Sequence, residues 1–155
     1  MTRSALGFTL IEMIITVSIM VIVAGMSVAG IVVFNQNQGI TDDSEQVLSE
    51  LRRAYSRATG IFYPPTCTGK LTGYKMTFTN GSKDITVTAQ CATNIAEIRI
   101  NVLKSSTFSG TTTLTISAGD GRVSGSPYTI TIRSVANTSL TKVIKVSDFG
   151  VFELL

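Results

Sequence analysis

Few residues in this chain have side chains that could do chemistry, and the most unusual of them is Glu12. It stands at the start of an apolar stretch, and from Met13 to Gln38 the sequence contains no charged residue. An ionisable side chain in such a membrane-like environment costs at least about 2.5–3.5 kcal/mol. We therefore expect Glu12 to have a charged partner or a functional role.

The apolar stretch itself is long enough to span a membrane. Residues 13–34 would form a helix of about 33 Å, which is close to the thickness of the hydrocarbon core of a bilayer. A short leader with one arginine, residues 1–7, precedes it, and Asp42, Asp43 and Glu45 follow soon after. The positive-inside rule then places the N-terminus in the cytoplasm and the bulk of the chain outside.

The N-terminal 34 residues resemble a prepilin of the type IV pilin and type II secretion pseudopilin family. The resemblance rests on the run Gly7-Phe8-Thr9-Leu10-Ile11-Glu12, in which a small residue, an aromatic residue and a glutamate fall in one register. It implies that a membrane aspartyl prepilin peptidase cuts between Gly7 and Phe8 and methylates the new amine of Phe8. It further implies that Glu12 meets the Phe8 ammonium of a neighbouring subunit, where two charges that are costly alone in lipid neutralise each other. This pairing would set the register of assembly.

One position departs from the pattern of that family. Its members typically carry a proline at the twenty-second mature position, which here is Ala29, although Gly25 and Gly30 could supply a soft segment instead. Two other interpretations of the N-terminal stretch remain open. It could be an uncleaved single-span anchor, or a secretory signal with Ser27-Val28-Ala29 as its small-x-small cleavage site. A secretory signal would have a shorter apolar region and should not carry Glu12.

The composition excludes several kinds of catalytic site. The chain has no histidine, which rules out His-based catalysis and His-ligated metals, and its cysteines, Cys67 and Cys91, both lie beyond the apolar stretch. An even number of cysteines outside the membrane predicts one disulfide in an oxidising compartment, the alternative being two free buried thiols. Residues 42–45 and 80–84 offer side-chain oxygens that could bind calcium, but their spacing matches no calcium loop. We therefore expect no metal, no cofactor and no enzymatic activity.

Beyond the apolar stretch, residues 44–59 have the pattern of an amphipathic helix. Asp43 is expected to cap the N-terminus of this helix, Gly60 to end it, and an irregularity is expected near Gly39. The arginines between positions 52 and 57 lie off the apolar face and are expected to be solvent-exposed or to contact another subunit. The apolar face, at helical spacing, consists of Val47, Leu48, Leu51, Ala54, Tyr55 and Ala58.

After Pro64-Pro65 the hydrophobic period changes from that of a helix to that of strands. Apolar and polar residues alternate in residues 74–78 and again in 85–89, and Asn80-Gly81 between them predicts a hairpin turn. Further alternating segments follow at intervals of about ten residues, which predicts an antiparallel sheet or sandwich. Their apolar positions are Ile98, Ile100 and Val102; Leu114 and Ile116; Tyr128, Ile130 and Ile132; Val143, Ile144 and Val146; and Val151, Phe152 and Leu154.

These observations predict an α+β fold. A long N-terminal helix, half transmembrane and half amphipathic, would pack on a C-terminal antiparallel β-sheet or sandwich, as in a pilin. The expected parts are a prepilin leader at 1–7, a transmembrane or filament-core helix at 8–34, an amphipathic helix half at 35–60 and an extracytoplasmic β-domain at 61–155. A Cys67–Cys91 bridge would tie the loop after the helix to the end of the second strand.

A second resemblance covers parts of the C-terminal region. Residues 114–125, 128–132 and 142–151 are similar to minor pseudopilins of the GspH/FimT type, in which a Gly-Arg turn and a Val-Ser-x-x-Gly turn recur. Some members of that group bind DNA through arginines after the last glycine, but this chain has Val151-Phe152-Glu153 there, so that site does not carry over. The net charge of +3 is too small to argue for nucleic acid. If the β-domain binds DNA, the candidate contacts are Arg122, Arg133, Lys142 and Lys145.

The resemblance implies a structural subunit, a pilin or minor pseudopilin, of a type IV pilus-like filament. Such a subunit is stored in the cytoplasmic membrane as a single-pass protein with its N-terminus inside. After cleavage by the prepilin peptidase, an assembly ATPase and a platform membrane protein move it into an extracytoplasmic filament. Its partners are membrane lipid before assembly and other pilin or pseudopilin subunits afterwards. Adhesion, motility, secretion and DNA uptake all remain open, as do a secretion pseudopilus tip subunit, a DNA-binding minor pilin and a simple membrane-anchored β-domain.

Overall fold

The computed structural model describes residues 9–65, 67–92, 95–124 and 128–155. By its internal contacts the chain divides into two units, Met1–Asn35 and Gln36–Leu155. The helix α1 spans Leu10–Thr59 and so extends through both. It is followed by the strands β1 (Leu71–Phe78), β2 (Asp84–Cys91), β3 (Ile95–Asn101), β4 (Ser106–Ser109), β5 (Thr112–Ser117), β6 (Val123–Ser124), β7 (Tyr128–Ser134), β8 (Thr141–Val146) and β9 (Phe152–Leu154).

The strands form two antiparallel sheets, which confirms the predicted β-architecture. The order is β3-β2-β1-β5-β6 in the first sheet and β4-β7-β8-β9 in the second. Met76 of β1 lies opposite Val87 of β2 and Leu114 of β5, and Ile130 of β7 lies opposite Ile144 of β8. These five side chains are buried. Pairing of this kind places apolar side chains on one face of each sheet. That apolar face must pack against another element to be removed from water.

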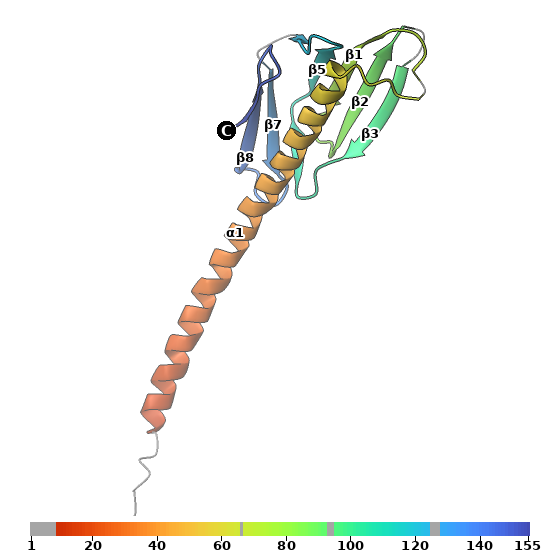
Figure 1. Cartoon of the computed structure of the whole chain (residues 1–155). Coiled ribbons are helices and arrows are strands. Elements are labelled where there is room, and N and C mark those ends of the chain that lie inside the picture. Colours follow the sequence, from red (N-terminus) through yellow and green to blue (C-terminus); the bar gives the residue numbers. More distant parts are fainter. Residues whose placement is uncertain (1–8, 66, 93–94, 125–127) are drawn as a thin grey trace, which may run out of the picture. The chain divides into compact units, whose positions relative to one another are not determined.

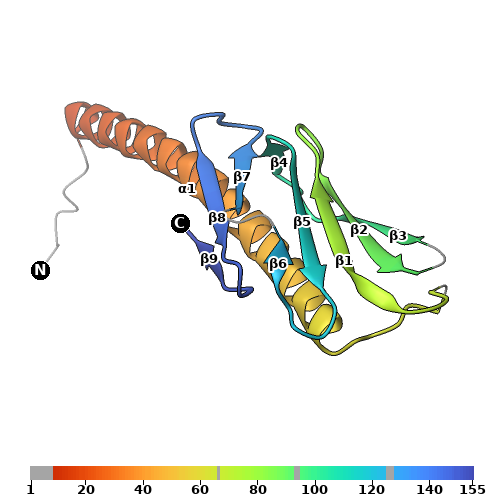
Figure 2. The same cartoon turned by 90° about the horizontal axis from the view of Figure 1, so that it is seen from above.

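The second half of α1 supplies that cover. In Figures 1 and 2 this part of the helix has β7 and β8 on one flank and β1 to β3 on the other. Val47, Leu51, Ala54 and Ala58 are buried in the core, and Leu48 and Tyr55 pack partly buried against it. The predicted apolar face of the amphipathic helix is therefore confirmed, and with it the packing of a long helix on antiparallel sheets.

Two expectations about the middle of the helix are wrong. The helix runs without interruption through Gly39 and Asp43, so Gly39 is not irregular and Asp43 is not an N-cap. Asp43 lies four residues before Val47, which puts it on the buried face of a continuous helix. Gly39 permits close packing, because a Cβ there would lie 3.0 Å from the Oγ of Ser105.

Two short strands are absent from the prediction. β4 contains one large apolar residue, Phe108, between serines and a threonine, and β6 is only two residues long. Phe108 is nevertheless buried and stacks edge-on against Phe78 of the first sheet, with ring centroids 5.2 Å apart. This aromatic pair joins the two sheets inside the core.

Candidate functional site

The first turn of α1 contains the predicted assembly residue, Glu12. Its Oε2 atom lies 3.4 Å from both the backbone nitrogen and the Oγ1 of Thr9, and the Glu12 backbone nitrogen donates to Thr9 Oγ1 at 3.4 Å. This reciprocal arrangement is a capping box, which satisfies backbone N–H groups at a helix start. Gly7 and Phe8, the predicted cleavage and methylation positions, lie outside the described residues.

The helix that follows Glu12 is apolar on all sides up to Phe34. It contains an 18-residue window of mean hydropathy 2.6, none of it buried, and so is long and apolar enough to cross a membrane. The hydroxyls of Thr16 and Ser18 donate to carbonyl oxygens of their own helix, at 2.9 and 2.8 Å. Hydroxyls satisfied in this way are compatible with a lipid environment.

A buried carboxylate, Asp43, anchors the other half of α1 to the β-domain. It accepts hydrogen bonds from the backbone nitrogens of Lys104 and Ser105, at 3.0 and 2.8 Å, and from the hydroxyl of Ser106 at 2.6 Å. Residues 104–106 lead from β3 in the first sheet to β4 in the second, so Asp43 fixes the crossing between the sheets. The sequence analysis missed this role. The signal that could have indicated it is the position of Asp43, an acidic residue in register with the apolar face of the helix.

Tyr55 fixes the β8–β9 turn to the helix. Its hydroxyl donates to the carbonyl oxygen of Phe149 at 3.3 Å, and its ring packs edge-on against Phe152, 5.9 Å between centroids. The ring also lies directly against Gly121 and Gly150, where any Cβ would overlap it. Both glycines have positive φ, 66° and 71°, which other residues rarely adopt. The position of this turn is therefore determined by the helix.

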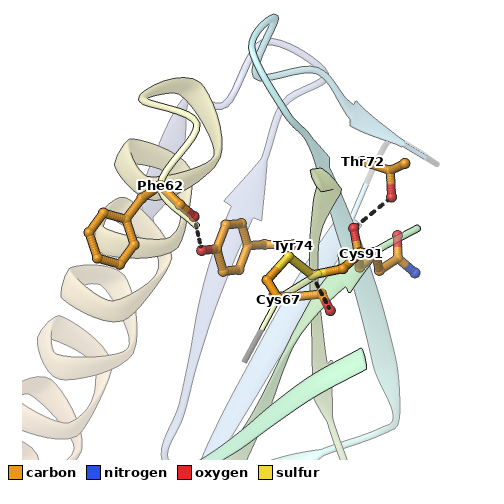
Figure 3. Close-up of a disulfide and its surroundings, with 7 residues drawn as sticks. Phe62, Cys67, Thr72, Tyr74 and Cys91 are labelled. Carbon is orange, nitrogen blue, oxygen red and sulfur yellow. Dashed lines mark hydrogen bonds between the residues drawn. A yellow bond between two sulfur atoms is a disulfide. The ribbon is translucent and has the colours of Figure 1, made fainter. Parts of the chain in front are cut away.

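The structure confirms the predicted disulfide. Cys67 in the loop after α1 is bridged to Cys91 at the end of β2, with their Cα atoms 5.7 Å apart (Figure 3). In the same view the hydroxyl of Tyr74 donates to the carbonyl oxygen of Phe62 at 2.6 Å. Burial raises the pKa of Tyr74, and the positive charge of Arg57 partly opposes that rise. The bridge and this hydrogen bond together hold the loop after the helix against the first sheet.

An apolar groove of about 190 Å³ lies between this loop and the first sheet, and we call it the Arg57 groove. The guanidinium of Arg57 lies 5.9 Å from the centroid of the Phe62 ring, within the range of a cation–π contact. The groove is lined by Tyr74, Val87 and Ala89 from β1 and β2, by Phe62, Pro64 and Pro65 from the loop, by Ile98 from the edge strand β3, and by Arg57.

The four basic residues considered as DNA contacts do not form one patch. Arg122 lies in the turn between β5 and β6 of the first sheet, whereas Arg133 and Lys145 are exposed on β7 and β8 of the second. Lys142 lies opposite Ile132, in register with the inner face of that sheet. DNA contact by these residues stays a prediction. In the described part of the chain, no group of three or more His, Cys, Asp or Glu residues could hold a metal ion.

Comparison with known proteins identifies the N-terminal segment. Residues 2–28 match the family model of the prokaryotic N-terminal methylation motif. The chain carries a prepilin-type N-terminus. This motif is typical of type IV pilins and pseudopilins, which are structural subunits processed by a prepilin peptidase, and the long helix packed on antiparallel sheets has the α+β arrangement of a pilin-like fold. No curated protein and no solved structure matches the chain.

Proposed function

We propose that the chain is a membrane-stored structural subunit, a pilin or pseudopilin, of a type IV pilus-like filament. The observation that carries the proposal is the methylation motif at 2–28, which leads directly into an apolar helix. The same helix continues without a break into the core of a folded β-domain. A chain of this design presents its domain outside the membrane while the apolar half is held in lipid.

The chemistry of assembly is assigned to Glu12 and to the amine of Phe8 after cleavage at Gly7. Within the described residues, the Oε2 atom of Glu12 bonds to Thr9, while its Oε1 atom has no hydrogen-bond partner. Oε1 is therefore available to the methylated Phe8 ammonium of a neighbouring subunit. Each charge is costly alone in an apolar filament core, so their pairing would favour one register of subunits over others.

The wider partners follow from this assignment. A prepilin peptidase would process the chain on the cytoplasmic side, and an assembly ATPase with its platform membrane protein would transfer it from lipid to the filament. The turns of the β-domain support a minor pseudopilin of the GspH/FimT type within this class. Gly121-Arg122 lies between β5 and β6, and the Val146-to-Gly150 segment leads from β8 to β9. Adhesion, motility, secretion and DNA uptake would all use this architecture.

Intact-mass analysis tests the proposal. The protein is recovered separately from cell envelopes and from sheared surface material. We expect a mature chain that begins at Phe8 and carries one methyl group, present in both fractions. A chain that begins at Gly30 would indicate a secretory signal, and a chain that retains Met1 would indicate an uncleaved anchor; either result contradicts the proposal.

A further inference from the structure

The Arg57 groove has room for one aromatic side chain from outside the domain. Its volume is about 190 Å³, and apolar cavities of about 150 Å³ are large enough for benzene. Two of its lining residues, Phe62 and Ile98, are themselves strongly exposed, so the groove is open to a partner. An open apolar site of this kind on a folded domain commonly marks an interaction surface.

A matching apolar projection lies in the β8–β9 turn, and we call it the Phe149 corner. Phe149 is 74% exposed and Val151 is 64% exposed, although they lie in a tight turn. The Gly150 backbone nitrogen donates to the Ser147 carbonyl oxygen at 3.0 Å, and the Ser147 nitrogen donates to the Val151 carbonyl oxygen at 2.9 Å. Tyr55 holds the turn from the helix side. The projection is therefore preorganised, which lowers the entropic cost of inserting it into a partner.

The charges beside the two features are complementary. Asp148, an exposed acid, directly precedes Phe149, while Arg57 lies at the groove. Within the described part of the chain, neither Asp148 nor Arg57 has an ion-pair partner. Opposite charges next to an apolar contact increase specificity and fix its orientation.

The corner and the groove lie on opposite flanks of α1. Tyr55 contacts the corner and Arg57 lines the groove, and two helical positions are about 200° apart around the helix axis. Figure 2 shows β8 and β9 on one side of this part of the helix and β1 to β3 on the other. One domain therefore cannot place its corner in its own groove. Different patches that complement each other form a head-to-tail contact, which can repeat without limit along a filament.

We infer that the Phe149 corner of one subunit docks in the Arg57 groove of a second copy of this chain, with the Phe149 ring in the groove and Asp148 beside Arg57. The inference rests on the proposed function and specifies one of its contacts between subunits. A repeat of this contact would link the β-domains on the outside of a filament whose apolar helix halves pack together.

Cysteine cross-linking of the full-length chain in filament-forming cells tests the contact directly. The variant Phe149→Cys/Ile98→Cys places one thiol on the corner and one in the groove. After mild oxidation, sheared filaments should give a ladder of dimers, trimers and longer species on a non-reducing gel. Each single variant, and the control Val135→Cys/Ile98→Cys, should give no ladder. Val135 is a suitable control because it is also apolar and 59% exposed but lies outside the corner.

A charge exchange tests the orientation of the contact. Asp148→Arg and Arg57→Asp should each reduce sheared filament at least tenfold, because each leaves two like charges facing one another. The double variant should return to within about twofold of the unmodified chain. Asp120→Arg, a change at an exposed acid in another turn, should have no effect. Resistance of the native Cys67–Cys91 pair to thiol labelling shows that each variant is folded.

The outcomes separate this contact from the proposed function. Normal filaments without a ladder in the Phe149→Cys/Ile98→Cys variant overturn the contact and leave the filament role standing. A cross-link from Ile98→Cys alone to a different protein also overturns it, because the groove then has another occupant. Absence of filaments from the unmodified chain refutes the filament role itself.

Discussion

The two halves of α1 share one backbone geometry but differ in how their side chains are covered. Up to Phe34 the large apolar side chains that the structure describes on α1 are 48–79% exposed, whereas Val47, Leu51 and Ala58 in the second half are fully buried. Helical structure depends on local hydrogen bonds, but removal of apolar surface from water depends on what lies nearby. The second half is covered by its own chain, while the first half needs lipid or other helices.

Glu12 and Asp43, one carboxylate from each half of this helix, differ in the same way. Among the described residues, the side chain of Glu12 makes hydrogen bonds only to Thr9, three residues away, at 3.4 Å. Asp43 makes three shorter ones to residues 104–106, more than 60 positions along the chain. The comparison indicates that Asp43 serves the folded domain, whereas Glu12 is not tied to that domain and stays compatible with the proposed contact between subunits.

The largest effect is expected at Glu12. Glu12→Val should reduce the protein in sheared filaments at least tenfold, because the Phe8 ammonium of the next subunit loses its counter-charge. The amount in membranes should be unchanged or slightly higher, since a costly group is removed from the apolar half. Cleavage after Gly7 should be largely unchanged, because Glu12 is not part of the scissile bond. Immunoblots of sheared and membrane fractions measure both quantities.

The control for this prediction is Glu45→Val, which removes an exposed acid from the covered half of the same helix. It should leave the filament level nearly unchanged. Normal assembly of the Glu12→Val variant beside unmodified subunits would show that Glu12 does not set the register. The contrast between the two carboxylates would then fail.

Removal of the disulfide should have the next largest effect. Cys67 and Cys91 are 24 positions apart, and closing such a loop stabilises a fold by about 3.5 kcal/mol in the chain-entropy model. Cys67→Ser/Cys91→Ser should therefore lower the free energy of unfolding of the β-domain by about that amount. Urea unfolding of the full chain in detergent measures it. Membrane insertion should not change, because the bridge belongs to the covered half; reduced insertion would contradict the division between the halves.

Asp43→Ala should destabilise the domain by about 3 kcal/mol. The change leaves the Lys104 and Ser105 nitrogens and the Ser106 hydroxyl without their acceptor, and each orphaned buried group costs about 1–3 kcal/mol, in part offset by water. Asp42→Ala is a matched control, because Asp42 is the adjacent residue and is exposed. It should change stability by less than about 0.5 kcal/mol. Equal effects of the two substitutions in urea unfolding would refute the anchoring role of Asp43.

The smallest effect is expected at Tyr74. Tyr74→Phe removes the hydrogen bond to Phe62 and should cost about 1 kcal/mol at pH 7. The raised pKa of Tyr74 means that the folded chain keeps the phenol proton at a pH where the unfolded chain loses it. The stabilisation is therefore complete below about pH 10 and is lost as the pH rises through the folded-state pKa. The difference in unfolding free energy between the two chains should shrink above pH 10; a constant difference would contradict this assignment.

Much of the fold could be predicted because its signals are local. The apolar face from Val47 to Ala58 and the alternation around Asn80-Gly81 repeat with the periods of a helix and a hairpin. β4 could not be predicted, because Phe108 is a single apolar residue with no alternation around it. The role of Asp43 could not be predicted either. In the sequence, an acidic residue before an apolar stripe looks the same whether it caps the helix or lies inside it. The groups that donate hydrogen bonds to Asp43 lie more than 60 residues away along the chain.

The candidate sites show the same difference between local sequence signals and contacts that form only on folding. The run from Gly7 to Glu12 predicted the methylation motif, and the even cysteine count predicted the Cys67–Cys91 bridge. The Arg57 groove gave no sequence signal, because it is formed by a helix end, a loop and three strands that meet only after folding. The basic residues at 122, 133, 142 and 145 look like a cluster in the sequence, but Arg122 lies at the first sheet and the other three at the second, where Lys142 is in register with the inner face and Arg133 and Lys145 are exposed.

In the proposed filament, the contact between Tyr55 and the β8–β9 turn would make subunit incorporation a check on folding. The Tyr55 hydroxyl and the Phe149 carbonyl are 94 positions apart, and one hydrogen bond does not offset the entropy of closing so long a loop unless the β-domain between them is folded. A partly folded chain would lack this bond and would leave the Phe149 ring without a fixed position. In the proposed contact, such a chain could not dock on its neighbour. Defective subunits would stay behind in the membrane, and the growing polymer would select complete domains without a separate proofreading factor.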